Sequence, residues 1–231
     1  YMSEPLIMIT EPYFFTKKTN FIELMLKKSS LPKPRVLYRY FSEENHANDF
    51  VQGKFRISTL SICRGYEDPA KGDPGEASST FHIAKAHSAT YDADFVNLLG
   101  KAGIKISGEY ENIMVENINN TSFLKDAYVL CLSLENTPSV FNDSFGKYCV
   151  RINHPESFFR ILSKQLVTQL GIHHCIANHI NYTSRVFSGS DTLPHLVEMA
   201  FVKPVIPYFL QQEFRMLWLT KNDNDMTFFD V

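Results

Sequence analysis

The sequence lacks the cysteine spacing that marks zinc sites and redox motifs. Its four cysteines lie far apart and form no CxxC pair; they are Cys63, Cys131, Cys149 and Cys175. No secretory leader is evident either. Both absences favour reduced thiols in a cytoplasmic protein.

Long apolar runs and an excess of charge of one sign are also absent. No stretch approaches the roughly 18 apolar residues of a membrane span, so we expect no membrane partner. The net charge of −2 gives the whole chain no pull towards nucleic acid, and any polyanion site has to be local. Aromatic residues are abundant, with 19 Phe and 11 Tyr, which indicates a deep core or one rich in β-structure.

Familiar catalytic and phosphate-binding motifs are missing or incomplete. Gly72-Asp-Pro-Gly75 matches neither GxGxxG nor GxxxxGK[ST], and residues 187–190 lack the second glycine of a GxSxG elbow. The histidines and the cysteine between residues 173 and 179 have no HExxH or CxxC spacing. We therefore expect no metal.

The remaining stretches predict a β-rich α+β protein. Apolar and aromatic runs predict strands over 35–41, 54–60, 80–87, 126–134, 147–152, 173–187, 207–219 and 226–231, with a hairpin over 104–115. Helical spacing predicts helices over 20–28, 42–52, 93–99, 155–170 and 193–202. Residues 62–79, rich in glycine, proline and charge, predict a long loop. Without a linker or repeat, we expect one domain, 1–231, on which an arm and a helix within 1–34 pack.

Residues 207–218 are distinctive because polar side chains recur at every second position of an aromatic, apolar stretch. On a β-strand, Gln211, Glu213 and Arg215 would share one face, with Cα atoms of alternate residues roughly 6.6 Å apart. A carboxylate in a core costs free energy unless it is paired or used. Two interpretations stay open here: an exposed or cross-strand ion pair of Glu213 and Arg215 on an edge strand, or a functional carboxylate.

Three separated motifs follow an order found in one enzyme family. Arg39 lies on a predicted first strand, Ser58-Thr59 ends a second, and Gln211-x-Glu213 lies near the C-terminus. In order and spacing they resemble the Arg–Ser–Glu class of ADP-ribosyltransferases. The last serine of that family's Ser-Thr-Ser motif is replaced here by leucine.

Residues 208–218 are also similar to bacterial toxin and phage-defence members of this superfamily. Some of these modify mRNA and are neutralised by an antitoxin protein, sometimes with a chaperone. The resemblance implies a split β-sheet core with peripheral helices, NAD as the ADP-ribose donor, and a toxin that transfers ADP-ribose to a macromolecular acceptor in anti-phage defence.

The acceptor is expected to be RNA, with protein and DNA as open alternatives. A glutamine at position 211 often accompanies acceptors other than arginine in the family. Basic residues near the expected site would provide a local patch for RNA; they are Arg35, Lys54, Arg56, Arg64, Lys203 and Arg215.

The resemblance implies a role for each motif residue. Glu213 would stabilise the oxocarbenium-like ribose left when nicotinamide departs, and Gln211 would orient or deprotonate the acceptor. Ser58 would hold Glu213 by a hydrogen bond, while Thr59 would support the strand end. Arg39 would pair with a phosphate of NAD.

The partner of the nicotinamide ring is expected to be an aromatic side chain, Tyr66 or Phe209.

Each motif residue also has an ordinary structural interpretation, under which the chain is a non-catalytic protein-interaction module. An RNA 2′-phosphotransferase-like reaction is a further alternative, but the sequence offers no His/Arg set with suitable spacing for it.

Overall fold

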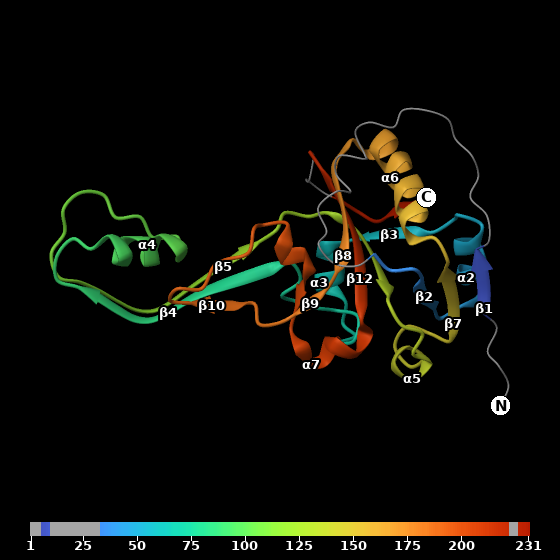
Figure 1. Cartoon of the computed structure of the whole chain (residues 1–231), viewed down its shortest axis with the longest axis horizontal. Helices are drawn as coiled ribbons and strands as arrows, with labels where there is room; N and C mark the ends of the chain where they lie inside the picture. Colours follow the sequence, from blue (N-terminus) through green and yellow to red (C-terminus); the bar gives the residue numbers. More distant parts are fainter. Residues whose placement is uncertain (1–5, 10–32, 222–225) are drawn as a thin grey trace. The chain divides into compact units, whose positions relative to one another are not determined.

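The computed structural model describes residues 6–9, 33–221 and 226–231 (Figure 1). The helix expected at 20–28 and most of the expected N-terminal arm lie outside these residues. The protein is a mixed α+β structure with several β-sheets. Within the described ranges, no helix is both long and apolar enough to cross a bilayer.

The chain forms two compact units, each assembled from segments that are far apart in sequence. The first comprises Tyr1–Pro74, Lys125–Asn181 and Ile206–Val231, and the second comprises Gly75–Leu124 and Tyr182–Val205. Each unit is described by itself, and the single domain expected from the sequence stays a prediction.

The first unit is built on a sheet with the strand order β1-β7-β2-β6-β12-β8. In addition, β3 pairs with β6, and β13 pairs with β3. Only the β1–β7 pair is parallel among these pairings. The strands are β1 (Leu6–Ile9), β2 (Leu37–Phe41), β3 (Arg56–Thr59), β6 (Tyr128–Ser133), β7 (Tyr148–Ile152), β8 (Ile172–His179), β12 (Glu213–Thr220) and β13 (Phe229–Asp230).

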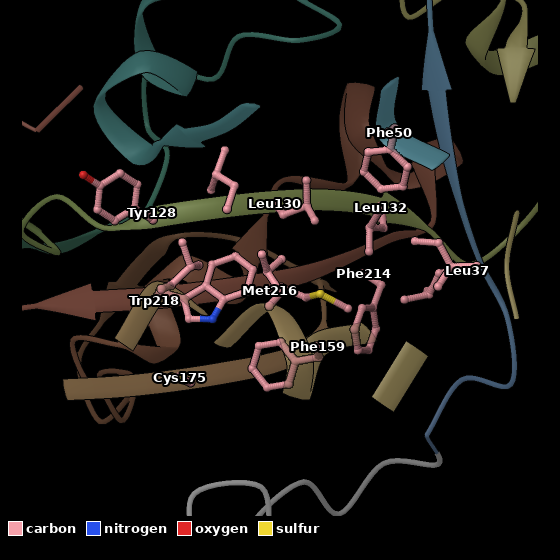
Figure 2. Close-up of a cluster of buried hydrophobic side chains, with 14 of the residues drawn as sticks. Leu37, Phe50, Tyr128, Leu130, Leu132, Phe159, Cys175, Phe214, Met216 and Trp218 are labelled. Carbon is pink, nitrogen blue, oxygen red and sulfur yellow. The ribbon is translucent and has the colours of Figure 1, made fainter. Parts of the chain in front are cut away.

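One face of this sheet carries the main hydrophobic core. Figure 2 shows Leu130 and Leu132 of β6 together with Met216 and Trp218 of β12, beside Phe159 of α6 (Pro155–Leu170). The apolar run predicted at 126–134 is thus confirmed as a central strand, buried at nearly every position.

Helix α6 covers this core and is confirmed over its predicted range. Pro155 occupies its first turn, where a missing N–H costs nothing, and Gly171 ends it in the left-handed region at φ 62°. The buried Trp218 indole donates its Nε1–H to Ser163 Oγ at 2.8 Å, so the polar atom of the largest core side chain is satisfied.

Shorter helices complete the first unit. They are α2 (Glu44–Val51), α3 (Leu60–Gly65), α5 (Pro138–Phe141), the kinked segment α7 (Val205–Tyr208) and the 3-10 helix η3 (Phe209–Gln211). The first residue of α7, Val205, is the last residue of the second unit. The prediction of a loop over 62–79 was wrong for residues 62–65, which belong to α3. The side chain of Thr59 caps α3 by accepting a hydrogen bond from the Ile62 N–H at 3.3 Å.

The strand expected over 207–219 begins later than predicted. Residues up to 211 form the turns α7 and η3, and Gln212 is left-handed with φ 43°. The strand itself is confirmed from Glu213 onward. Pro207 has no N–H to donate to a neighbouring strand, and the left-handed conformation of Gln212 turns the chain. The prediction relied on aromatic composition and overlooked both features.

The second unit contains a three-stranded sheet in the order β10-β4-β5. The hairpin expected over 104–115 was wrong. In the structure, residues 113–123 form a single strand that pairs antiparallel with β4. The core of this unit comprises Phe81, Ile83, Phe95, Leu99 and Ala102. The elements are β4 (Ser78–Ser88), α4 (Ala93–Lys101), β5 (Ile113–Phe123), β10 (Val186–Ser188), the 3-10 helix η2 (Glu198–Phe201) and β11 (Val202–Lys203), and β9 (Asn181–Tyr182) lies at the boundary.

Candidate functional site

The strands that carry Arg39, Ser58 and Glu213 all pair with β6. On one edge of β6, β2 pairs at Tyr38↔Ser133 and β3 pairs at Ser58↔Val129. On the other edge, β12 pairs at Glu213↔Ser133. Two strands thus share one edge of β6, at its two ends, and the three motifs converge on one strand.

The register nevertheless places Arg39 and Glu213 on opposite faces of the sheet. Directly paired residues share a face, so Tyr38, Ser133 and Glu213 lie on one side. Arg39 follows Tyr38 and therefore faces the other side, where its neighbour across the ladder is the core residue Val150. The roles expected for Arg39 and Glu213 on one NAD molecule require a common groove, which this sheet alone does not form.

Ser58 lies on the face of Glu213 but far from it. Their partners on β6, Val129 and Ser133, are four residues apart, and the two strands flank opposite edges of β6. About 14 Å along the strand and about 10 Å across two strand spacings give roughly 17 Å between their Cα atoms. The hydrogen bond expected from Ser58 to Glu213 does not fit this register.

Glu213 instead forms a buried ion pair with Arg215 on the same strand. Arg215 Nε and Nη2 both donate to Glu213 Oε1, at 2.9 and 2.7 Å. Glu213 is 4% exposed and Arg215 1%. Because β12 lies between β6 and β8, the ion pair belongs to the sheet interior, not to an exposed edge strand. Removing one partner of such a pair typically costs about 3–5 kcal/mol.

Gln211 precedes the strand and does not share the face of Glu213. Its Nε2 donates to the carbonyl of Ala70 at 2.7 Å, and Ser133 Oγ donates to the Gln211 carbonyl at 3.0 Å. Tyr208 Oη donates to the Gly72 carbonyl at 2.9 Å. The segment 70–72 is therefore tied to the residues that immediately precede Glu213.

The other residues expected at the site differ in exposure. Thr59 is fully buried, and its Oγ1 lies 2.8 Å from Ser61 Oγ, so it serves the start of α3. Tyr66 is 46% exposed and Phe209 48%, which leaves ring surface available to a ligand in both cases.

Arg39 lines a cavity of about 510 Å³ between β2, β3 and α2. Its Nη1 donates to the Cys131 carbonyl, at the point of β6 between the β2 and β3 pairings. Its Nε is buried and has no hydrogen-bond partner among the described residues. Other polar lining residues are His46, Asp49, Lys54, Arg56 and Asp230.

Within this cavity, Arg56 is already paired. Its guanidinium binds both carboxylate oxygens of Asp230, at 2.8 and 3.1 Å, and lies over the Phe228 ring. Arg39 and Lys54 are the cations left to meet an anionic group, with Phe41 and Phe55 providing aromatic surface. The arrangement suits a phosphate attached to a planar ring.

Two of the basic residues expected to contact RNA are unable to do so. Arg215 is held by Glu213, and Lys203 is 4% exposed in the second unit, where its Nζ lies 3.7 Å from Glu76. Arg35, Lys54 and Arg56 are exposed, and Arg64 is partly exposed.

The histidines near residue 175 do not gather around one point. His179 lines a second cavity of about 260 Å³ with His154 and Phe214, while burial and the neighbouring His173 lower the pKa of His174. Across the described part of the chain, no group of three or more His, Cys, Asp or Glu residues could hold a metal ion.

Sequence reasoning missed one feature of the face that carries Glu213. Cys131, the cross-strand neighbour of Arg215, is hydrogen-bonded through its thiol to Cys63 of α3. That bond and burial together raise the pKa of Cys131 well above its ordinary value. No sequence signal pointed to this contact, because 67 residues lie between the two cysteines.

Comparisons with protein-family models, with curated proteins and with solved structures found no match. The chain is a mixed α+β protein with two notable sites. A buried ion pair of Glu213 and Arg215 lies at the start of the central strand β12, and a cationic cavity lined by Arg39 lies on the opposite face of the same sheet.

Proposed function

We propose that the chain is an NAD-dependent ADP-ribosyltransferase with an ADP-ribosyltransferase-like split sheet, and that it acts as a toxin in anti-phage defence. The observation that carries the proposal is the convergence of β2, β3 and β12 on β6. Three short motifs that resemble one family in sequence order thereby lie on, or directly before, strands that each pair with β6. The divergence of β2 and β3 along one edge of β6 supports the split sheet.

The proposed chemistry requires a carboxylate beside the reacting ribose. When the bond between ribose and nicotinamide breaks, its electron pair leaves with nicotinamide and positive charge develops on the sugar. Glu213 would stabilise that charge, and Arg215 fixes the orientation of the carboxylate through two hydrogen bonds to Oε1. The acceptor then attacks the anomeric carbon, and Gln211 would orient it.

Arg39 is proposed to bind the phosphate end of NAD in the cavity that it lines. Because this cavity lies on the sheet face opposite Glu213, the dinucleotide would have to pass between β2 and β3, where they diverge along β6, to meet both residues. Its unpartnered Nε and the exposed Lys54 supply the positive charge, and a planar guanidinium suits two-point contact with a phosphate. Tyr66 or Phe209 would cover the nicotinamide ring.

Access to Glu213 has to involve movement, because only 4% of this residue is exposed. The segment 70–72 is the natural element to move, since two side-chain hydrogen bonds, from Tyr208 and Gln211, tie it to the approach of β12. Its release would expose the start of β12 without breaking the sheet.

Incubation with NAD labelled in its adenylate phosphate tests the proposal. The purified chain is mixed with a cell extract, and RNA, DNA and protein are then separated and counted. Label in nuclease-sensitive RNA is the expected result and would support an RNA-modifying toxin, for which we propose an antitoxin and a chaperone as partners. Label in protein or DNA would change the acceptor, and no label in any pool would favour an interaction module without catalysis.

Replacing Glu213 by glutamine is expected to abolish transfer, because the transition state needs charge at this position and an amide supplies only shape. The change also leaves Arg215 buried without its carboxylate, at a cost of about 3–5 kcal/mol. The double variant Glu213→Gln/Arg215→Gln removes both charges and serves as the matched, better-compensated control. Thermal unfolding shows whether each variant is folded, and transfer retained by a folded Glu213→Gln protein would refute the role of Glu213.

A further inference from the structure

Cys63 and Cys131 meet on the sheet face that carries Glu213. The Cys131 thiol is hydrogen-bonded to Cys63, and Cys63 Sγ lies 4.0 Å from Ser58 Oγ. The strand register agrees, because Ser58 pairs with Val129, which is two residues from Cys131 and on the same face. A helix and the central strand thus bring two thiols from distant parts of the chain into contact.

We propose that Cys63 and Cys131 form a reversible dithiol–disulfide couple, which links α3 covalently to β6 when it is oxidised. The two sulfur atoms have to move from hydrogen-bond contact to a bond of about 2.05 Å. Cys63 lies on the six-residue helix α3, so the bond requires a shift of this helix towards β6. This inference does not depend on the proposed transferase activity.

The other two thiols are poor partners for this chemistry. Cys149 and Cys175 are buried on β7 and β8, with 7% and 5% exposure. Cys175 pairs with Trp218 and faces the hydrophobic core, so it lies on the opposite face of the sheet from Cys131. Cys63 is half-buried and within reach of a small oxidant.

Hydrogen peroxide is the oxidant class that the reaction requires. The sulfur of Cys63 attacks one peroxide oxygen, the O–O bond breaks, and the departing hydroxide takes the thiol proton as water. Cys131 then attacks the resulting sulfenic sulfur, the S–O bond breaks, and the released hydroxide takes the Cys131 proton as a second water. Two thiols lose two electrons in total, and one peroxide becomes two waters.

The order of attack follows from the environments of the two thiols. The hydrogen bond to Cys63 and burial raise the pKa of Cys131, so Cys131 keeps its proton until the sulfur beside it is oxidised, and it attacks that adjacent sulfenic sulfur as the departing hydroxide takes the proton. The disulfide would immobilise β6 beside Arg215, the neighbour of Cys131 across the ladder, and beside Arg39, which donates to the Cys131 carbonyl.

The test treats the purified full chain with hydrogen peroxide under native conditions, blocks remaining thiols with N-ethylmaleimide, and digests with trypsin without reduction. The expected product is a linked pair of peptides, 57–64 and 126–147, which contain Cys63 and Cys131 and no other cysteine. Two of the four thiols should disappear and return after treatment with dithiothreitol.

Variants separate this pairing from general oxidation. Cys63→Ser should abolish both the linked peptides and the paired loss of thiols, whereas Cys149→Ser should retain them. Melting curves before oxidation establish that each variant is folded. Sulfinic or sulfonic acid at Cys63 without the link, a link to another cysteine, or four unreacted thiols in the folded wild-type protein would overturn the proposal.

Discussion

At the scale of single residues, the pairing of Glu213 with Arg215 explains how a charged side chain survives inside the sheet. Alternate residues of a strand share a face, and the long arginine side chain reaches back to place two N–H groups on one carboxylate oxygen. Burying both ions costs free energy that their attraction recovers only with good geometry. Replacing such an ion pair by apolar residues often leaves the free energy of unfolding unchanged or raises it, so stability alone does not explain the two charges. The pair is therefore a candidate for function.

The contribution of Arg39 to NAD binding is a second prediction at this scale. Arg39→Ala removes the guanidinium from its cavity, and we expect NAD to bind roughly 10- to 100-fold more weakly, as for the loss of a charged hydrogen bond. Isothermal calorimetry measures the dissociation constant directly. Arg160→Ala, which removes a surface cation of α6, is the matched control and should leave that constant unchanged.

Arg39 also has a structural role, because its Nη1 satisfies the Cys131 carbonyl where β2 and β3 diverge. A lower melting temperature of Arg39→Ala is therefore expected whether or not NAD binds there. Only an unchanged dissociation constant in the folded variant would show that the phosphate site lies elsewhere.

Ser163 is predicted to matter for stability alone. Ser163→Ala leaves the fully buried Trp218 Nε1–H without its acceptor, so the free energy of unfolding should fall by about 1–3 kcal/mol. Urea denaturation measures this change. Ser157→Ala, at an exposed position of the same helix, should stay within about 0.5 kcal/mol of the wild type. Equal stabilities for the two variants would contradict the role assigned to the indole hydrogen bond.

At the scale of elements, the segment 70–72 depends on a close approach that only glycine permits. A Cβ atom at Gly72 would lie 2.1 Å from the Tyr66 carbonyl oxygen, so Gly72→Ala has to displace the segment and its bonds from Tyr208 and Gln211. We expect a loss of about 1–3 kcal/mol in unfolding free energy, as for overpacking, together with slower ADP-ribose transfer.

Gly65→Ala provides the comparison for this change, because nothing lies within 4 Å of a Cβ atom at that position. Urea denaturation and the labelled-NAD assay are applied to both variants. If the two alanine variants behave alike, the segment does not need its present conformation for folding or for transfer.

The elements that could be predicted from the sequence are those whose signals are local. The apolar run at 126–134 and the stripe of α6, with Pro155 at its start and Gly171 at its end, both produced the expected structure. The turn before Glu213 could not be predicted, because distant carbonyls at Ala70 and Gly72 hold it. Aromatic composition favoured a strand there, and tertiary contacts prevailed.

The candidate site was predictable only as a set of residues, not as an arrangement. Alternation correctly put Glu213 and Arg215 on one face, but it wrongly included Gln211, which precedes the strand. Which face of β2 matches which face of β12 depends on the pairing Tyr38↔Ser133, a long-range register that no local pattern specifies.

At the scale of the whole molecule, charge limits how the protein can hold an RNA acceptor. The net charge is −2, so no general attraction to a polyanion exists. Of the six basic residues expected to form a local patch, Lys203 and Arg215 are buried in ion pairs. Four remain accessible, and one of these, Arg56, is already shared with Asp230.

RNA binding should therefore depend only modestly on salt. Each phosphate contact to a single strand contributes about −0.7 to the slope of log K against log salt, so four contacts give a slope no steeper than about −3. Fluorescence anisotropy of a labelled RNA oligonucleotide, between about 50 and 200 mM KCl, measures that slope. Lys54→Ala should flatten it by about 0.7, whereas Lys164→Ala on α6 should not change it. A slope much steeper than about −3 would require a basic surface beyond these four residues, and the acceptor would then be held by another part of the chain.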